Sequence, residues 1–376
     1  MTLSPVVETL AGLVRINSIN PAYESGTSEA GLVEYIEQFF AKRSIRTWRQ
    51  EVFPGRPNLI AAVPGRQSSR RLILEAHTDT ASVKGMTIPP FEPRVEGGRL
   101  YGRGACDTKG GLAAMMHALA AVAESGRKPP CEVWLVAAAD EEYSYRGVVK
   151  LCEGLTAHGA VVAEPTSMRL VTATKGCVRF KVHTRGKAAH SSKPHLGVNA
   201  ISGMARVILA IEKDCESLKA RSHPLLGSGT CNIGIVTGGT QVNIVPDECS
   251  IEIDRRLLPG EEPRATVEHF REVVKAVPGV DAQVDAPMLE DLPLDTRIDE
   301  RIVLAASAAL ADLGLSPAPT GVPYGSDASK LAAAGVPSVV FGPGSIDQAH
   351  AAVEYVDSSE VEHASEFYRR LMLVFE

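Results

Sequence analysis

RLILEAHTD (residues 71–79) carries the clearest fold signal in this 376-residue chain. Its apolar part has the length of a buried strand, and it ends at the polar group His77-Thr78-Asp79. A strand holds a side chain at its carboxyl end more firmly than a loop does, and ligands of open α/β sheets bind at that end. We therefore expect His77 to begin a functional site.

Acidic and histidine residues stand at similar places elsewhere in the chain. CEVWLVAAAD (131–140) precedes a pair of glutamates, and GAVVA (159–163) precedes another glutamate. The loop GRGACDTKGG (102–111) leads into an alanine-rich helix, and SVVFGPGSIDQA (338–349) is followed by a histidine. The residues at these places are Asp107, Glu141, Glu142, Glu164 and His350.

Together with His77, this set contains four carboxylates and two imidazoles. If they gather at one edge of a sheet, the carboxylates repel one another and are costly to remove from water. Cations among them relieve both penalties, because histidine nitrogens and carboxylate oxygens are ligands for divalent metals. The pattern therefore predicts a two-metal hydrolase.

The bulk composition describes a globular protein with a sizeable core. Hydrophobic residues make up 44% of the chain and charged residues 22%. The length exceeds one typical domain of roughly 100–200 residues, which predicts two. A net charge of −6 argues against nucleic acid as a partner, because a phosphate-binding surface needs a basic excess.

Cysteine usage and the N-terminal segment predict a cytoplasmic protein. The seven cysteines are scattered without a CxxC pair, so neither a disulfide framework nor a zinc ribbon is expected. The first residues form an amphipathic pattern without a basic leader, unlike a signal peptide. No apolar run reaches the roughly 18 residues that a membrane span needs, so no membrane partner is expected.

The first half of the chain alternates helical and strand patterns. Apolar residues at helical spacing mark a helix over 29–43, and strong helix formers mark another over 111–124. Such alternation predicts an α/β fold with a mostly parallel sheet flanked by helices. The strands are expected at 58–63, 72–77, 131–138 and 160–163.

The pattern changes near residue 173. CVRFKVHTRG (176–185) alternates apolar and polar residues, as a strand with one exposed face does. Helices over 199–213 and 265–276 and further short strands complete a smaller α+β unit with an antiparallel sheet. We therefore predict a discontinuous catalytic domain over 1–173 and 289–376, interrupted by an inserted lid or dimerisation domain over 174–288.

Eight stretches, in order along the whole chain, carry a family resemblance. The chain resembles the M20 (aminoacylase/carboxypeptidase-like) metallopeptidase family, and most closely its acetylornithine deacetylase and succinyl-diaminopimelate desuccinylase branch. The stretches are HTDT, GRGACDTKGG, DEE at 140–142, AEPTS at 163–167, GKAAHSSKP at 186–194, VNIVPD at 242–247, DRRLLPGE at 254–261 and GPGSIDQAHAAVEYV at 342–356.

The resemblance implies which residues hold two divalent metal ions. It places His77 and Glu164 on one ion, and Glu142 and His350 on the other, with Asp107 bridging both. Zinc suits these ligands best, and cobalt or manganese fit the same set. Asp79, two residues after one of the histidines, suits the role of a carboxylate that accepts the free ring N–H and fixes the tautomer.

Glu141 is the expected general base. Neighbouring side chains on an extended segment point in opposite directions, so Glu142 can face a metal while Glu141 faces the substrate. The resemblance further implies that His190 stabilises the oxyanion and that Asn243 meets the substrate, both often from the partner subunit of a homodimer. Exposed sheet edges on an inserted domain also favour a dimer.

Two more substrate contacts follow from the resemblance. Arg255 in DRRLLPGE matches the residue that grips the substrate carboxylate, a task for a planar guanidinium. Its neighbour Arg256 is barely separable from it by sequence. Ser326, in the loop Gly325–Asp327, is expected to line the substrate site.

The first functional hypothesis is a metal-dependent amidohydrolase of amino-acid metabolism. It would cleave N-acyl-L-amino acids by attack of a metal-bridged water, as an acetylornithine deacetylase does. A carboxypeptidase or dipeptidase acting on short peptides is the alternative within hydrolysis, and a non-catalytic metal- or ligand-binding protein with the same fold is the alternative from a different functional class. The chain contains no P-loop, GxSxG or HExxH motif. The acyl group, the amino acid, the native metal and the pathway stay open.

Overall fold

The alternating segments of the first half and the period-two segments after residue 173 fold into separate units. The computed structural model describes residues 3–376. Unit 1 comprises the chain up to Thr172 together with Thr296–Thr320 and Ser326–Glu376. Unit 2 comprises Ala173–Asp295 and Gly321–Gly325, so the second unit extends seven residues beyond the expected end at 288. Whether unit 2 acts as a lid or a dimerisation domain stays a prediction.

Unit 1 is built on a mixed sheet, which confirms the expected α/β class. Its central strands are parallel, with β3 between β6 and β7 and with β20 beside β7, whereas the outer pairs β1–β2, β2–β6 and β8–β20 are antiparallel. The strands, in sheet order, are β1 (Arg46–Phe53), β2 (Arg56–Val63), β6 (Cys131–Ala138), β3 (Gln67–His77), β7 (Gly159–Val162), β20 (Ser338–Val340) and β8 (Val171–Thr174).

Edge strand β1 is the long strand that the sequence did not reveal. It reads RTWRQEVF and has no fully buried residue, so no apolar run marks it. By contrast, every residue of β2 after its first is buried, because β2 lies between β1 and β6. Burial on both faces is what makes a strand visible as an apolar run.

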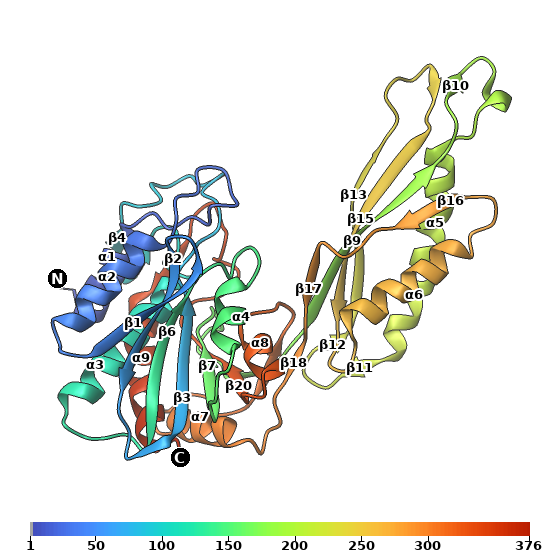
Figure 1. Ribbon diagram of the computed structural model, residues 1–376. Helices are drawn as coiled ribbons and strands as arrows, with labels where there is room; N and C mark the ends of the chain where they lie inside the picture. Colours follow the sequence, from blue (N-terminus) through green and yellow to red (C-terminus); the bar gives the residue numbers. More distant parts are fainter. Residues whose placement is uncertain (1–2) are drawn as a thin grey trace. The chain divides into compact units, whose positions relative to one another are not determined.

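Helices cover both faces of this sheet (Figure 1). Leu72 and Leu74 of β3 join the main hydrophobic core with the larger helices, while the alternate residues Ile73 and Glu75 point to the other face. The helices that contribute to the main core are α1 (Pro5–Val14), α2 (Ala30–Ala41), α3 (Lys109–Glu124), α7 (Arg301–Ala311) and α9 (Ser358–Val374). The shorter helices α4 (Arg146–Cys152) and α8 (Ala328–Ala333) pack together on the other face.

A small three-stranded sheet joins distant parts of unit 1. β5 (Arg99–Tyr101) pairs with both β4 (Arg94–Glu96) and β21 (Tyr355–Asp357). The pairing of Tyr355 with Tyr101 holds the segment that follows His350 beside the loop that leads to Asp107. Two candidate ligands that are far apart in sequence therefore reach the same place.

Unit 2 contains an antiparallel sheet of order β13-β15-β9-β16, covered on one face by two helices (Figure 1). Phe180 and Phe270 pack against each other in the core between sheet and helices, with tilted rings whose centroids are 5.1 Å apart. The sheet elements are β9 (Gly176–Arg185), β13 (Thr230–Gly238), β15 (Glu248–Leu257), β16 (Asp281–Val284) and β17 (Leu289–Asp291), and the helices are α5 (Ala200–Cys215) and α6 (Pro263–Lys275). Shorter strands are β10 (Ala189–His190), β11 (Ser222–His223), β12 (Gly227–Ser228) and β14 (Ile244–Val245). Two further short strands, β18 (Leu294–Asp295) and β19 (Thr320–Val322), pair with β8 and so belong to the mixed sheet.

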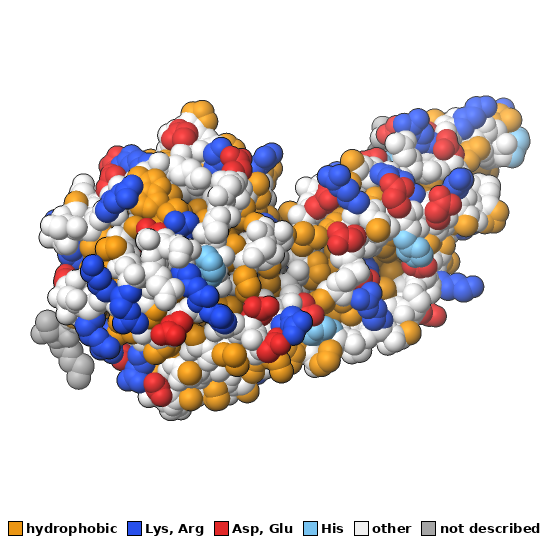
Figure 2. All heavy atoms as spheres, turned by 60° about the horizontal axis from the view of Figure 1, so that its bottom comes forward, with side chains coloured by type: hydrophobic (Ala, Val, Ile, Leu, Met, Phe, Trp, Pro, Cys, Tyr) orange, Lys and Arg blue, Asp and Glu red, His pale blue; other side chains and the backbone are white. Residues whose placement is uncertain are grey.

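The visible surface carries mixed charge. Figure 2 shows basic and acidic side chains interspersed over the face that it draws, without a broad basic area. Within residues 3–376, no helix combines the length and the apolar character that crossing a membrane requires.

Candidate metal centre

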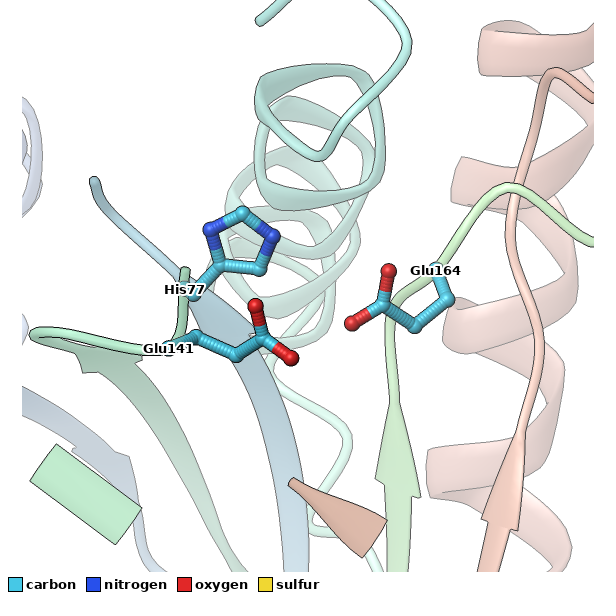
Figure 3. Close-up of side chains that lie close together, drawn as sticks. All are labelled: His77, Glu141 and Glu164. Carbon is cyan, nitrogen blue, oxygen red and sulfur yellow. The ribbon is translucent and has the colours of Figure 1, made fainter. Parts of the chain in front are cut away.

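The parallel order β6-β3-β7 brings the carboxyl ends of three strands to one edge of the sheet. His77 is the last residue of β3, Glu141 follows β6, and Glu164 follows β7. Figure 3 shows these three side chains pointing toward one another from their separate strands. The convergence that the sequence predicts is therefore present for this group.

Asp107 lies between the two candidate histidine ligands. Its Oδ1 is 2.9 Å from Nε2 of His77, and its Oδ2 is 3.4 Å from Nε2 of His350. The same His350 nitrogen is 3.0 Å from Oε2 of Glu142. One carboxylate with an oxygen directed to each side is the arrangement expected of a group that bridges two cations.

Two sets of side chains each bring three possible ligand atoms close enough together to hold a cation. The sets overlap at His77, whose Nδ1 faces the carbonyl of Asp79, so that its Nε2 can serve only one ion. One set is His77, Glu141 and Glu164, and the other is His77, Asp107 and Glu142; within each set the ligand atoms lie within 4.8 Å of one another. One oxygen of Glu164, Oε1, is buried without a hydrogen-bond partner. A buried carboxylate oxygen without a partner is costly, and a bound cation would satisfy it. The side chains present therefore fit divalent metal ions.

The pKa shifts indicate that, without metal ions, protons reduce the negative charge of this cluster. Burial raises the pKa of Glu164 well above its ordinary value, and burial raises that of Glu141 to about 8, although the nearby His77 opposes the second shift. Hydrogen bonds to two carboxylates raise the pKa of His350 to about 10. Burial opposes ionisation of Asp107, but hydrogen bonds from both imidazoles hold its pKa well below its ordinary value. Metal binding replaces such protons, since ligating histidines must be neutral.

Asp79 has a wider role than fixing the tautomer of His77. Nδ1 of His77 lies 2.9 Å from the backbone carbonyl of Asp79 and 3.6 Å from its carboxylate, so the carbonyl is the closer partner. The carboxylate instead accepts the backbone N–H of Glu141 (3.1 Å) and of Glu142 (3.0 Å). Asp79 thus positions the segment that carries the expected base.

Asn20 supports the same segment, and no sequence signal marked it. This buried residue donates from Nδ2 to Asp79 (2.7 Å) and to Asp140 (2.9 Å). Tyr23 adds a hydrogen bond of 2.7 Å from its hydroxyl to the carbonyl of Glu142. Both residues come from an irregular loop without periodicity, so only the folded structure reveals them.

Ser326 is placed beneath the surface. Its side chain is 1% exposed, and its hydroxyl accepts the backbone N–H of Ala328 at the start of α8. Next to it, Asp327 is fully buried, and burial raises its pKa well above the ordinary value. This placement favours support of the loop over direct contact of the Ser326 side chain with a substrate.

His190 and Asn243 are brought together within unit 2. His190 pairs with Ile244 between β10 and β14, and the backbone N–H of Ser191 donates to the carbonyl of Asn243 at 3.0 Å. The side chain of His190 is exposed, with Nδ1 2.8 Å from the hydroxyl of Ser192. The expected metal ligands all belong to unit 1, so these two residues form a separate group.

Arg255 and Arg256, which the sequence barely separates, lie on opposite faces of β15. Arg255 is 2% exposed and forms an ion pair of 2.6 Å with Glu261. The side chain of Arg256 is 29% exposed and pairs with Asp254 at 2.7 Å. Breaking the buried pair would leave Glu261 with an uncompensated charge, whereas an exposed pair exchanges partners at little cost. The placement does not favour the predicted role of Arg255 and favours Arg256 as the residue available to a substrate carboxylate.

Comparisons with known proteins agree with this site. The model of "Peptidase family M20/M25/M40" matches residues 73–374. The chain is 35% identical over 311 residues to an acetylornithine deacetylase of Myxococcus xanthus, covering 80% of this chain and 79% of the relative. It is 28% identical over 388 residues to a probable succinyl-diaminopimelate desuccinylase of Staphylococcus aureus (strain MSSA476), covering 93% and 92%. The expected resemblance to this branch is confirmed.

A solved structure confirms the fold. A tripeptidase from Staphylococcus aureus subsp. aureus Mu50 superposes with a TM-score of 0.81 at 24% identity, covering 98% of this chain and 97% of the other. With the family match over most of the sequence, and with a site of clustered histidine and carboxylate side chains, this chain belongs to peptidase family M20/M25/M40 and is a metal-dependent amidohydrolase.

Proposed function

We propose that this protein removes the acyl group from an N-acyl-L-amino acid, with two divalent metal ions in its site. The observation that carries the proposal is the position of Glu141, whose carboxylate lies among the candidate ligands His77 and Glu164 at the strand ends. The similarity to an acetylornithine deacetylase supports the choice of an acylated amino acid as the substrate class.

The proposed ligands divide into two groups around Asp107. His77 and Glu164 would hold one ion, Glu142 and His350 would hold the other, and Asp107 would be shared by both. Zinc is the proposed metal, and cobalt and manganese are the alternatives with the same ligand chemistry. When bound, such ions polarise the amide carbonyl and lower the pKa of water.

Glu141 is proposed to move the proton. Its carboxylate accepts a proton from the attacking water and then donates it to the nitrogen of the leaving amine. Asp79 fixes the backbone of Glu141 through the hydrogen bond at 3.1 Å, so the base is held in place by a group that does not react. A fixed base is what an efficient proton transfer requires, because the donor and acceptor must lie within hydrogen-bond reach.

The residues of unit 2 supply the proposed substrate contacts. Arg256 binds the α-carboxylate, since its guanidinium is accessible, and Arg255 is the alternative. His190 donates to the oxyanion of the tetrahedral intermediate, and Asn243 beside it contacts the substrate. A carboxylate contact serves peptides equally well, so a carboxypeptidase or dipeptidase remains the second candidate until substrates are compared.

The metal assignment predicts two zinc ions per chain and a specific effect of Asp107→Asn. We expect this variant to hold fewer ions, because an amide supplies a single neutral oxygen and cannot bridge two cations. Elemental analysis of dialysed protein measures the stoichiometry, and Glu141→Gln serves as the matched control that keeps both ions. Retention of two ions by Asp107→Asn would refute the bridging role.

Turnover of a substrate panel tests the function itself. We expect amine release from one or more N-acyl amino acids, and a fall in kcat of about 10²–10⁴-fold in Glu141→Gln with the metals retained. The panel contains N-acetylornithine, N-acetylcitrulline, N-acetylmethionine, N-succinyl-diaminopimelate and a dipeptide with C-terminal glutamate. Hydrolysis of the dipeptide alone would replace the deacylase proposal with the peptidase one.

The two neighbouring arginines are expected to respond differently to replacement by methionine. Arg256→Met should raise KM by about 10–100-fold, as the loss of a charged hydrogen bond to substrate does, with little change in stability. Arg255→Met should lower the free energy of unfolding by about 1–3 kcal/mol, because it removes the ion-pair partner of the partly buried Glu261. Steady-state kinetics measures KM, and denaturant titration measures the free energy of unfolding, for both variants. The opposite pattern would assign binding of the substrate carboxylate to Arg255.

The edge of unit 2 supports a homodimer. Ile235 and Val236 of edge strand β13 are 52% and 63% exposed, and Leu209 on α5 is 65% exposed. An edge strand with exposed apolar side chains pairs readily with a second copy. Sedimentation velocity should show a dimer that Val236→Lys converts to monomer, while Leu304→Lys, at a solvent-exposed position of α7 in unit 1, leaves it intact. An active wild-type monomer would contradict this proposal.

A further inference from the structure

Glu354 is a buried carboxylate that none of the proposed catalytic steps uses. Its side chain is fully buried, and it forms an ion pair of 2.6 Å with Nη1 of Arg103. It also accepts three backbone N–H groups, from Gly104 at 3.0 Å, Cys106 at 3.0 Å and Asp107 at 3.1 Å. The last of these donors belongs to the proposed bridging ligand itself.

The position of Glu354 in the chain makes these contacts significant. It follows His350 by four residues and immediately precedes β21, which pairs with β5. Its own carbonyl accepts the N–H of Gly102 at 3.1 Å. Side chain and backbone therefore both connect the segment of His350 with the loop of Asp107.

The connection extends to a third part of the site. Arg103, held by Glu354, donates from Nη2 to the carbonyl of Ser82 at 2.8 Å. Ser82 lies in the loop that continues from Asp79, after the end of β3. The carboxylate thus lies at the centre of a hydrogen-bonded group that joins three segments, each of which carries a proposed site residue.

The chemistry of the contacts requires a carboxylate. An ionised carboxyl group has about four lone-pair sites and no donor, which matches three N–H groups and one guanidinium. A glutamine of the same size would turn its own NH₂ group toward at least one of these donors. The loop 102–107 would then lose part of its anchor without a large change in volume.

We propose that Glu354 is a positioning residue for the metal centre, which fixes the backbone of Asp107 relative to His350 so that both side chains reach their metal ions. This inference rests on the proposed function. Groups behind metal ligands commonly determine affinity, and their loss lowers metal affinity or activity by about 10–100-fold. Glu354 differs from the usual case because it acts on the ligand's backbone and not on its side chain.

The test compares Glu354→Gln with Glu360→Gln. Glu360 accepts one backbone N–H, from Gly344 at 2.7 Å, so it controls for loss of a carboxylate in the same region. Three quantities are measured: amide hydrogen exchange of residues 102–107 in metal-free protein, the zinc dissociation constant by competition with a chromogenic chelator, and kcat and KM.

For Glu354→Gln we expect faster exchange in 102–107, a zinc dissociation constant raised about 10–100-fold, and a lower kcat with KM little changed. Glu360→Gln should leave the exchange and the zinc affinity at wild-type values. Phe40→Leu, a replacement in the buried core, should lower the unfolding temperature without weakening zinc binding. This last variant separates positioning from general destabilisation.

Glu354→Asp keeps the charge with a shorter reach, and it should give intermediate exchange and zinc affinity if the glutamine variant does not fold. Wild-type zinc affinity in either Glu354 variant would overturn the inference while leaving the proposed function intact. A wild-type protein that binds none of zinc, cobalt and manganese would instead refute the proposed function, and the role of Glu354 with it.

Discussion

The burial of several carboxylates at one edge of a parallel sheet is the constraint on which the rest of unit 1 depends. Strand geometry forces His77, Glu141 and Glu164 together, and burial raises the pKa of both glutamates. The surrounding structure compensates with imidazoles, with backbone N–H groups aimed at Asp79, and with a donor set suited to cations. The groups that offset the repulsion among the buried carboxylates are thus the same groups that are proposed to carry out catalysis.

Much of this arrangement follows from the sequence because the central strands are buried on both faces. Runs such as LILEA (72–76) and GAVVA (159–163) are visible as apolar segments, and the polar residues that end them mark the site. Parallel order then places those ends together without further information. The family resemblance supplied the division of ligands between two ions, which spacing alone does not give.

Other features depend on contacts that no local pattern encodes. Strand β1 lies at the edge of the sheet and has no fully buried residue, and Asn20 lies in an irregular loop, so neither produces a periodic pattern of apolar residues. The choice between Arg255 and Arg256 depends on which face of β15 meets the helices, and this is a question of register. Glu354 lies in the matched stretch 342–356, yet its role becomes visible only through the backbone groups it contacts.

The interrupted path of the chain through unit 1 has a consequence for its synthesis. Strand β20 and His350 follow the whole of unit 2, although they complete a sheet and a site begun before it. In a nascent chain, His77, Asp107 and Glu164 are therefore made before His350, and the proposed ligand set stays incomplete until the last segment emerges. Long-range pairing of this kind is slow to form. Both metal ions would then bind only when folding is complete. A protein truncated before His350 would keep the acidic cluster but lack the imidazole that contacts Asp107 and Glu142.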